Sequence, residues 1–381
     1  MKYDFLIVGA GIAGASIAHE LAPHGAVCML EAESRPGYHA TGRSAALFAP
    51  SYGGREIRAL TRASRRFFDH PPQGFGDHPL LTPRGCLYIA RVDQRLRLER
   101  TVDSIRASGG ALAAIEIPEA VARVPLIRRG YLAAAALDSD AMDIDVGALH
   151  QGFIRRARAA GATLMTGIKV TNVRRRHGTW SLQLNDEVVS ASVLVNAAGA
   201  WADELALMCG TGRIGLQPLR RTALLVDAPA GVDVRSWPAV IDADEKFYFK
   251  PDAARLLLSP ADEIPQEPGD AQPEDLDVAI GVDRVQAALD IEVQRINHRW
   301  AGLRTFSPDR VPVVGFDPEV EGLFWCAGQG GYGIQTAPAL ARAAAALARQ
   351  EDLPTDVAME GLTAADLSPR RFVSSLSVGA S

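Results

Sequence analysis

The first thirty residues alternate between apolar runs and a glycine-rich turn. Residues 5–8 form a short continuous apolar run, which is typical of a strand buried on both faces of a parallel sheet. Apolar positions then recur at helical spacing over residues 12–21, and residues 27–30 form a second apolar run. The pattern predicts a strand, a glycine turn over residues 9–14, a helix and a second strand.

Three glycines in the spacing GxGxxG join the first predicted strand to the helix. The first permits a tight bend, the second lets a pyrophosphate approach the positive end of the helix, and the third allows close packing of helix on strand. Glu31 ends the second predicted strand, 22 residues after Gly9, where a carboxylate can accept hydrogen bonds from a ribose diol. The alternative is that the glycines serve packing alone. The candidate dinucleotide-binding residues are Gly9, Gly11, Ile12, Ala13, Gly14 and Glu31.

A loop dense in small and hydroxyl residues follows, from Pro36 to Ala46. Its backbone amides, hydroxyls and single guanidinium are free to meet a second phosphate group and a flat ring. An ordinary glycine-rich surface turn is the alternative. The candidate binding residues of this loop are Thr41, Gly42, Arg43, Ser44, Ala45 and Ala46.

Composition and charge narrow the class of protein. The chain has 381 residues, 48% of them apolar and 22% charged, as expected for a folded globular protein of about two domains. A net charge of -5 argues against a general nucleic-acid binder. The four cysteines are widely scattered with no CxxC or Cys/His cluster, so neither a disulfide framework nor a metal site is expected.

The apolar stretch 5–18 has the length of a signal-peptide core and follows Lys2. Asp4 and the three glycines of the turn oppose that interpretation. No other stretch approaches the 18 or more apolar residues of a membrane span. We therefore expect a cytoplasmic protein.

Three separated blocks resemble the flavoprotein oxidoreductases typified by D-amino-acid oxidase, glycine oxidase and sarcosine oxidase. They are GAGIAGAS with Glu31 and the loop HATGRSAA, then VLVNAAGAWA at residues 193–202, then GQGGYGIQ at residues 328–335. Within that family, the strings PGYHATGRSAA, LVNAAGAWAD, FYFKPDA and WAGLR are similar to the bacterial D-arginine dehydrogenases. The resemblance implies FAD as the cofactor.

The resemblance also implies the fold. We expect an α/β protein, α+β overall, in which a Rossmann-like FAD-binding domain is interleaved with an antiparallel-sheet substrate domain. The FAD-binding domain would comprise residues 1–80, 145–210 and 308–381, and the substrate domain residues 81–144 and 211–307.

Further cofactor contacts are implied by the later blocks. A helix is predicted over residues 337–349 with Pro338 in its first turn, and its start offers free amides and a positive dipole end for the charge on a reduced flavin. The backbone of Val170 would meet adenine. The later candidate cofactor residues are Val170, Ala198, Gly199, Trp201, Gly302, Gly330, Gly331, Tyr332, Gly333, Ile334 and Gln335.

On the substrate side, the resemblance implies that Arg221, Tyr248 and Arg304 converge on a substrate carboxylate. A guanidinium matches a carboxylate with two parallel hydrogen bonds, and a phenol can donate a third. Successive strand residues point to opposite faces, so only one of Arg220 and Arg221 can reach the ligand. Tyr52, beside two glycines, looks like a residue of a mobile loop that closes over the site, although an ordinary turn remains the alternative.

The predicted activity is FAD-dependent oxidative deamination of D-amino acids by hydride transfer, giving an imino acid and then a 2-oxo acid and ammonia. Cys86 stands where the relatives carry an acid for a cationic side chain, and Leu47 where they carry a histidine. We therefore expect neutral or apolar D-amino acids to be preferred over D-Arg. The alternatives are oxidation of glycine, sarcosine, a proline derivative or a 2-hydroxy acid, an electron-transfer subunit without substrate chemistry, and a nicotinamide-only dehydrogenase. The electron acceptor, whether quinone, oxygen or protein, stays open.

Overall fold

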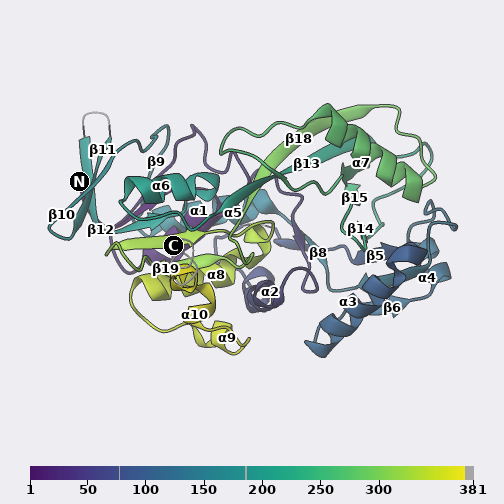
Figure 1. Cartoon of the computed structure of the whole chain (residues 1–381), viewed down its shortest axis with the longest axis horizontal. Helices are drawn as coiled ribbons and strands as arrows, with labels where there is room; N and C mark the ends of the chain where they lie inside the picture. The colour runs from purple at the N-terminus through teal and green to yellow at the C-terminus, as the bar shows by residue number, and fades with distance from the viewer. Residues whose placement is uncertain (77, 185–186, 374–381) are drawn as a thin grey trace, which may run out of the picture.

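The computed structural model describes residues 1–76, 78–184 and 187–373, which form two large sheets with helices around them (Figure 1). The first sheet has the strand order β10-β11-β12-β1-β2-β9, with β20 paired to β12 and β19 to β20. Its strands are β1 (Lys2–Val8), β2 (Val27–Leu30), β9 (Thr163–Met165), β10 (Val173–Arg176), β11 (Thr179–Leu184), β12 (Glu187–Asn196), β19 (Val313–Phe316) and β20 (Leu323–Ala327).

The parallel part of this sheet carries the predicted dinucleotide unit. β20, β12, β1, β2 and β9 run parallel to one another, and α1 (Ile12–Leu21) connects β1 to β2. α1 packs against α5 (Val146–Ala159) and α8 (Gly333–Ala348), and α8 packs against α2 (Arg55–Asp69). The predicted strand, glycine turn, helix and strand are thereby confirmed. The helices cover the faces of the parallel strands, which explains why the strands are continuous apolar runs.

The second sheet is mostly antiparallel and lies on the right in Figure 1. Its order is β17-β13-β16-β15-β14-β5-β7-β6, with β18 paired to β13, and only the β14–β5 pair is parallel. Its strands are β5 (Cys86–Ala90), β6 (Ala113–Ile115), β7 (Ala134–Asp138), β13 (Gln217–Asp227), β14 (Ala239–Asp242), β15 (Tyr248–Asp252), β16 (Arg255–Ser259), β17 (Ile264–Pro265) and β18 (Ile296–Phe306).

Smaller elements complete the fold. A three-stranded sheet of β3 (Leu47–Phe48), β8 (Met142–Ile144) and β4 (Leu81–Pro83) accompanies the two large ones. The remaining helices are η1 (Val92–Gln94), α3 (Arg95–Ala107), α4 (Ile117–Arg123), η2 (Gly199–Trp201), α6 (Ala202–Met208), α7 (Asp275–Ala288), α9 (Thr355–Ala358), α10 (Ala364–Leu367) and η3 (Pro369–Phe372).

The predicted α/β class is confirmed, with one parallel-core sheet and one antiparallel sheet. The strands of the first sheet lie within residues 2–30, 163–196 and 313–327, and those of the second within residues 86–138 and 217–306. The exact domain boundaries stay a prediction.

One predicted helix begins earlier than expected. α8 starts at Gly333 rather than at residue 337, so Pro338 lies inside the helix. Its ring removes the bond to the carbonyl of Ile334. The next amide, that of Ala339, donates to the hydroxyl of Ser64 on α2 at 3.1 Å. Residues 333–335, expected in a glycine turn, therefore form the first helical turn.

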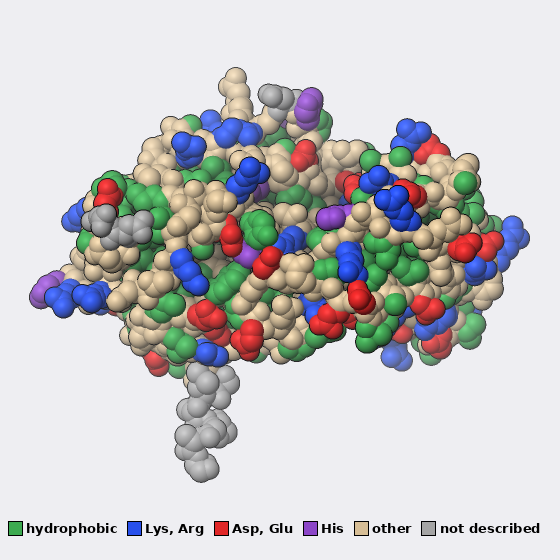
Figure 2. All heavy atoms as spheres, turned by 90° about the horizontal axis from the view of Figure 1, so that it is seen from above, with side chains coloured by type: hydrophobic (Ala, Val, Ile, Leu, Met, Phe, Trp, Pro, Cys, Tyr) green, Lys and Arg blue, Asp and Glu red, His purple; other side chains and the backbone are tan. Residues whose placement is uncertain are grey.

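Charge is spread evenly over the surface in view. On the face shown in Figure 2, basic and acidic side chains of the described residues are interspersed, without an extended patch of one sign. Within residues 1–76, 78–184 and 187–373, no helix is both long and apolar enough to cross a membrane.

Candidate active site

A cavity of about 550 Å³ is lined by residues of both large sheets. Its lining includes the ends of β1 and β2, the loop 37–47, and parts of β13, β15, β18 and α8. Three candidate cofactor residues, Gly14, Gly42 and Tyr332, lie outside this lining. The candidates that line it are Gly9, Gly11, Ile12, Ala13, Glu31, Thr41, Arg43, Ser44, Ala45, Ala46, Val170, Ala198, Gly199, Trp201, Gly302, Gly330, Gly331, Gly333, Ile334 and Gln335.

Two glycines of the turn after β1 are required by space. Gly9 has φ +100°, and a Cβ there would lie 2.4 Å from the carbonyl oxygen of Ala197 at the end of β12. A Cβ on Gly14 would lie 1.8 Å from the carbonyl oxygen of Gly9. Gly14 therefore allows the helix to pack on the turn, as expected of the third glycine.

The peptide of Ala10 is held from both sides. Its N–H donates to Glu31 Oε2 at 2.9 Å, and its carbonyl accepts from His150 Nε2 at 2.8 Å. Burial lowers the pKa of His150, so the ring is neutral and carries its proton on Nε2. Glu31 Oε1 accepts from the amide of Glu33 at 3.0 Å, so each carboxylate oxygen keeps a lone pair for a ribose hydroxyl. Sequence reasoning missed His150, because nothing local distinguishes it from any other helical histidine.

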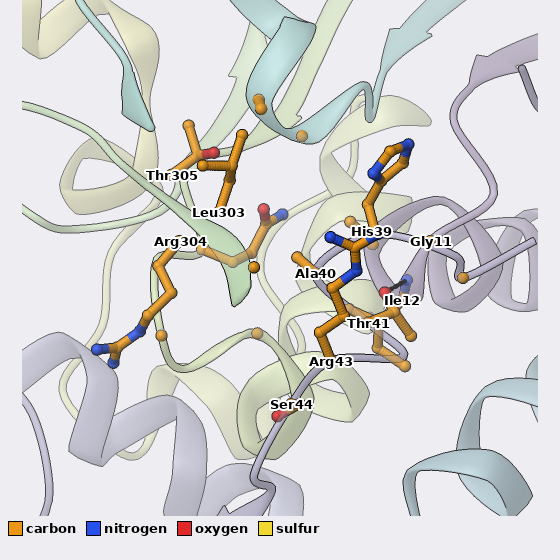
Figure 3. A pocket seen from close by; sticks show the side chains of 18 of the residues that line it. Gly11, Ile12, His39, Ala40, Thr41, Arg43, Ser44, Leu303, Arg304 and Thr305 are labelled. Atoms are coloured by element: carbon orange, nitrogen blue, oxygen red, sulfur yellow. Dashed lines mark hydrogen bonds between the residues drawn. The ribbon is translucent and has the colours of Figure 1, made fainter. Parts of the chain in front are cut away.

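Thr41 caps the first helix. Its Oγ1 accepts a hydrogen bond from the amide of Ile12 at 2.9 Å, the dashed line in Figure 3. Gly11, the N-cap residue, has no side chain to do this. The loop after Glu31 is thereby joined to the start of α1, where a pyrophosphate would lie.

Arg43 joins the same loop to the second sheet. Its Nη1 donates to the carbonyls of Ala271 at 2.9 Å and Ala301 at 2.8 Å, and its Nη2 pairs with Asp270. The guanidinium is thus largely engaged, in contrast to the expectation that it is free to meet a phosphate. Its place in the cofactor site stays a prediction.

Arg304 lies at the opposite end of the cavity from Ile12 and Thr41 (Figure 3). The guanidinium packs over Gly331, where a Cβ would lie only 1.4 Å from Arg304 Nη2. Its Nη1 is buried and has no hydrogen-bond partner among the described residues. An unpaired buried donor is costly, so this atom fits an anionic ligand in the cavity.

Gln335, in the first turn of α8, offers a second such donor. Its Oε1 accepts from the amide of Ala49 at 3.0 Å, whereas its Nε2 is buried and has no hydrogen-bond partner in the described part of the chain. Gln335 lines the cavity beside Gly333 and Ile334. The helix start and this amide together fit an electronegative ring edge.

Strand alternation separates Arg220 from Arg221 as expected. Arg221 lines the cavity, with its Cζ 6.0 Å from the ring centre of Tyr248, which also lines it. Arg220 is buried on the other face, where it forms ion pairs with Asp277 at 2.7 Å and with Glu274. Arg220 therefore does not reach the cavity.

Tyr52 lies where this cavity adjoins a second, outer one of about 950 Å³. Its hydroxyl donates to Glu245 Oε2 at 3.3 Å, and its ring centre is 5.3 Å from that of Tyr332. Burial raises the pKa of Tyr52, so the phenol keeps its proton. Glu245 lies on the turn after β14 with φ +55° and lines both cavities. Glu245 is a site residue that the sequence pattern did not indicate.

The end of the cavity that holds Arg304, here called the substrate end, is otherwise largely apolar. Leu47, Ala223, Ala239 and Ile241 line it, together with Lys250, whose ammonium group pairs with Asp143 at 2.5 Å. Cys86 is fully buried outside the lining. The thiol therefore contributes no polar group to the cavity.

Comparison of the whole sequence with known protein families identifies the family of this chain. A profile for the DAO family, described as FAD dependent oxidoreductase, matches residues 4–347. The chain belongs to this family. Its cofactor is therefore FAD, and the residues fit it: the glycine turn with Glu31 lies at one end of the cavity, and the free donor of Gln335 lies further along.

Individual relatives are distant. The hydrogen cyanide synthase subunit HcnC of Pseudomonas aeruginosa is 28% identical over 55% of this chain, a match that spans half of that relative's length (50%). The uncharacterized oxidoreductase YurR of Bacillus subtilis is 26% identical over 88% of this chain and 92% of its own. The resemblance to the D-arginine dehydrogenases stays a prediction.

Solved structures agree with the fold. Glycine oxidase from Geobacillus kaustophilus superposes with a TM-score of 0.82 at 23% identity, covering 95% of this chain and 99% of that one. L-proline dehydrogenase from P. horikoshii gives a TM-score of 0.82 at 21% identity, with 98% of each chain covered. At these identities the likeness establishes the fold.

Proposed function

We propose that this flavoprotein oxidises amino acids at the bond between the α-carbon and its nitrogen, and that its substrates are neutral or apolar D-amino acids rather than D-Arg. The product is an imino acid, which water converts to a 2-oxo acid and ammonia. Support comes from the names of the relatives and structural neighbours, which include a glycine oxidase of Bacillus licheniformis and the L-proline dehydrogenase.

The observation that carries the proposal is the buried Nη1 of Arg304, which has no hydrogen-bond partner among the described residues and lies at the end of the cavity opposite the glycine turn. Arg221 and Tyr248 line the same end. Two guanidiniums and a phenol are the groups that a substrate carboxylate prefers in a buried site. They would hold the carboxylate so that the hydrogen on the α-carbon faces the flavin, and such positioning supplies roughly 7 to 11 kcal/mol.

The chain's own residues would act by binding the substrate and orienting it. Bound FAD supplies a two-electron acceptor for the hydride. The ammonium of the substrate would lose its proton to water, which leaves a neutral amine whose lone pair forms the C=N bond as the hydride departs, so no side chain has to act as a strong base. Tyr52 and Glu245, at the junction of the two cavities, would control access and exclude water during the reaction.

The lining supports the preference for neutral side chains. Ala223, Ala239 and Ile241 are apolar, and the ammonium of Lys250 pairs with the carboxylate of Asp143, so this ion pair offers no free anion to a cationic side chain. The acid Glu245 already binds Tyr52. A guanidinium without a free carboxylate partner would be costly to bury here.

The test is anaerobic titration of the yellow holoenzyme with D-Met, D-Phe, D-Ala, D-Arg, glycine, sarcosine and the L-forms, followed by flavin absorbance. We expect bleaching by neutral D-amino acids at lower concentration than by D-Arg. Arg304→Ala is the matched variant and should retain FAD but need a far higher amino-acid concentration for its reduction. A chain that no amino acid reduces, or one for which D-Arg is clearly the best substrate, contradicts the proposal.

A further inference from the structure

One carboxylate of the chain contacts the arginines of the substrate end. Glu263 Oε1 lies 3.2 Å from Arg221 Nη2, 3.7 Å from Arg304 Nη1 and 2.8 Å from Arg310 Nη2. Glu263 lines the outer cavity, whereas Arg304 lines the inner one. The carboxylate therefore approaches Arg221 and Arg304 from the outer cavity.

The turn that carries Glu263 is fixed to the strand that carries Arg221. The carboxylate of Asp262 accepts from the amide of Thr222 at 2.6 Å and from its hydroxyl at 2.9 Å. The carbonyl of Asp262 accepts from Arg221 Nε at 2.7 Å. Arg221 thus donates to two successive residues of one turn, which fixes the plane of its guanidinium.

Arg221 and Arg304 come from neighbouring strands. In the antiparallel pair of β13 and β18, Arg221 lies opposite Gly302 and Leu219 lies opposite Arg304. The side chains of Arg221 and Arg304 are only 13% and 15% exposed, so two like charges are confined close together with little water between them. Such a pair splays apart unless an anion lies near both.

Glu263 is ionised in this setting. Burial alone would raise the pKa of Glu263, but the hydrogen bond from Arg310 and the positive charges of Arg310, Arg221 and Arg304 outweigh it and hold the pKa below its usual range. Arg310 in turn stacks on Phe306 with its Cζ 3.8 Å from the ring centre. The carboxylate is thus itself held by a third, well-packed arginine.

We propose that Glu263 is a positioning residue, which holds Arg221 and Arg304 at the spacing that one substrate carboxylate requires. The inference rests on the proposed function, since it takes these two arginines as the carboxylate-binding groups. Its hydrogen bond fixes Arg221 from behind, and its nearby charge keeps Arg304 from swinging away. Arg304 Nη1 keeps an N–H free for the ligand.

The experiment compares three holoenzyme variants. Glu263→Ala removes both the acceptor and the charge, and Glu263→Gln keeps an acceptor oxygen. Glu267→Ala removes a charge from the same loop at a residue whose side chain forms no hydrogen bond or ion pair within the described part of the chain. Each variant is titrated with benzoate, a carboxylate that carries no oxidisable amine, by flavin absorbance. KM and kcat are then measured with the best amino acid.

For Glu263→Ala, we expect the benzoate Kd and the substrate KM to rise about tenfold, the equivalent of 1.4 kcal/mol. Its kcat should stay within about twofold of the parent, because a substrate once bound is itself the anion between the arginines. Glu263→Gln should restore most of the binding, and Glu267→Ala should match the parent. FAD content and melting temperature show whether each variant is folded, and Glu263→Gln carries the test if the alanine variant is not.

Three results overturn the inference. Glu263→Ala could bind benzoate as the parent does, or more tightly than the parent, which would make Glu263 a competitor of the ligand. Glu263→Gln could be as weak as the alanine variant, which would show that the hydrogen bond to Arg221 does not position that guanidinium. If the parent binds no benzoate and no amino acid reduces it, the proposed function fails. If amino acids reduce the parent but substitution of Glu263 changes neither the benzoate Kd nor the KM, this inference alone fails.

Discussion

Replacing Gly331 by alanine should disable the substrate end through Arg304. The added Cβ would lie 1.4 Å from Arg304 Nη2 and 2.0 Å from its Cζ, whereas real Cβ contacts essentially never fall below 3.0 Å. The φ of Gly331 lies outside the left-handed region, so alanine is not strained by the backbone itself. The guanidinium therefore has to move.

The size of the effect follows from the required displacement. Nη2 has to retreat by 1.6 Å or more to reach 3.0 Å from the new methyl group. Hydrogen bonds span only about 2.7 to 3.2 Å between heavy atoms, so the contact with a substrate carboxylate is lost. Loss of one partner of a buried charge pair costs about 2 to 5 kcal/mol. We therefore expect kcat/KM to fall roughly 30- to 5,000-fold.

A double-mutant cycle isolates the cause. Steady-state kcat/KM is measured for the parent, Gly331→Ala, Arg304→Ala and the double variant, with FAD affinity measured in each. Because the three atoms nearest to the added methyl group all belong to Arg304, Gly331→Ala should cost less than about twofold in that background. A Gly331→Ala enzyme within threefold of the parent, or two mutations whose costs simply add, would refute the reasoning.

Three further predictions test other parts of the molecule. Thr41→Val leaves the amide of Ile12 without its hydrogen-bond acceptor, so the free energy of FAD binding, measured by equilibrium dialysis, should weaken by about 1 to 3 kcal/mol. Thr41→Ser keeps the acceptor and should bind FAD as the parent does. Asp145→Ala removes the cap that accepts from the amide of Ala148 at 2.8 Å, and should lower the free energy of unfolding in urea by about 1 kcal/mol with unchanged FAD content. Burial, with a smaller effect of Arg156, lowers the pKa of His19 to about 4. Since the unfolded chain takes up this proton near pH 6.5, stability should fall between about pH 6.5 and 4, and urea melts of His19→Gln should show a smaller fall.

Sequence predicted the parts of the site that depend on local pattern. The strand, glycine turn and helix around Gly9 follow from residues adjacent in the chain, and buried apolar runs have few alternatives. Strand alternation alone separated Arg221 from Arg220, because the two faces of a strand differ by one residue. The family resemblance placed Leu47 where relatives carry a histidine near the flavin, and Leu47 lines the cavity.

The missed residues act across long separations. His150 meets the carbonyl of Ala10, 140 residues away, and Tyr52 meets Glu245, 193 residues away. Neither histidine nor glutamate carries a local signal of such a contact, since both are common on exposed helices and turns. Arg43 shows the reverse case: its loop looked free in the sequence, but Ala271 and Ala301 occupy its guanidinium.

Two buried side-chain donors without a hydrogen-bond partner in the described part of the chain indicate where ligands bind. Arg304 Nη1 and Gln335 Nε2 are both buried, both on residues that line the cavity, and both without a hydrogen-bond partner in the part of the chain that the structure describes. Each such group costs about 1 to 3 kcal/mol, which a chain with no ligand at this site would have no reason to retain. One donor lies at the start of α8, where its dipole favours negative charge, and the other between two aromatic rings and Gly331. Under the proposed function, FAD with a substrate carboxylate beside it would satisfy both donors, and ligand binding would then stabilise the folded protein.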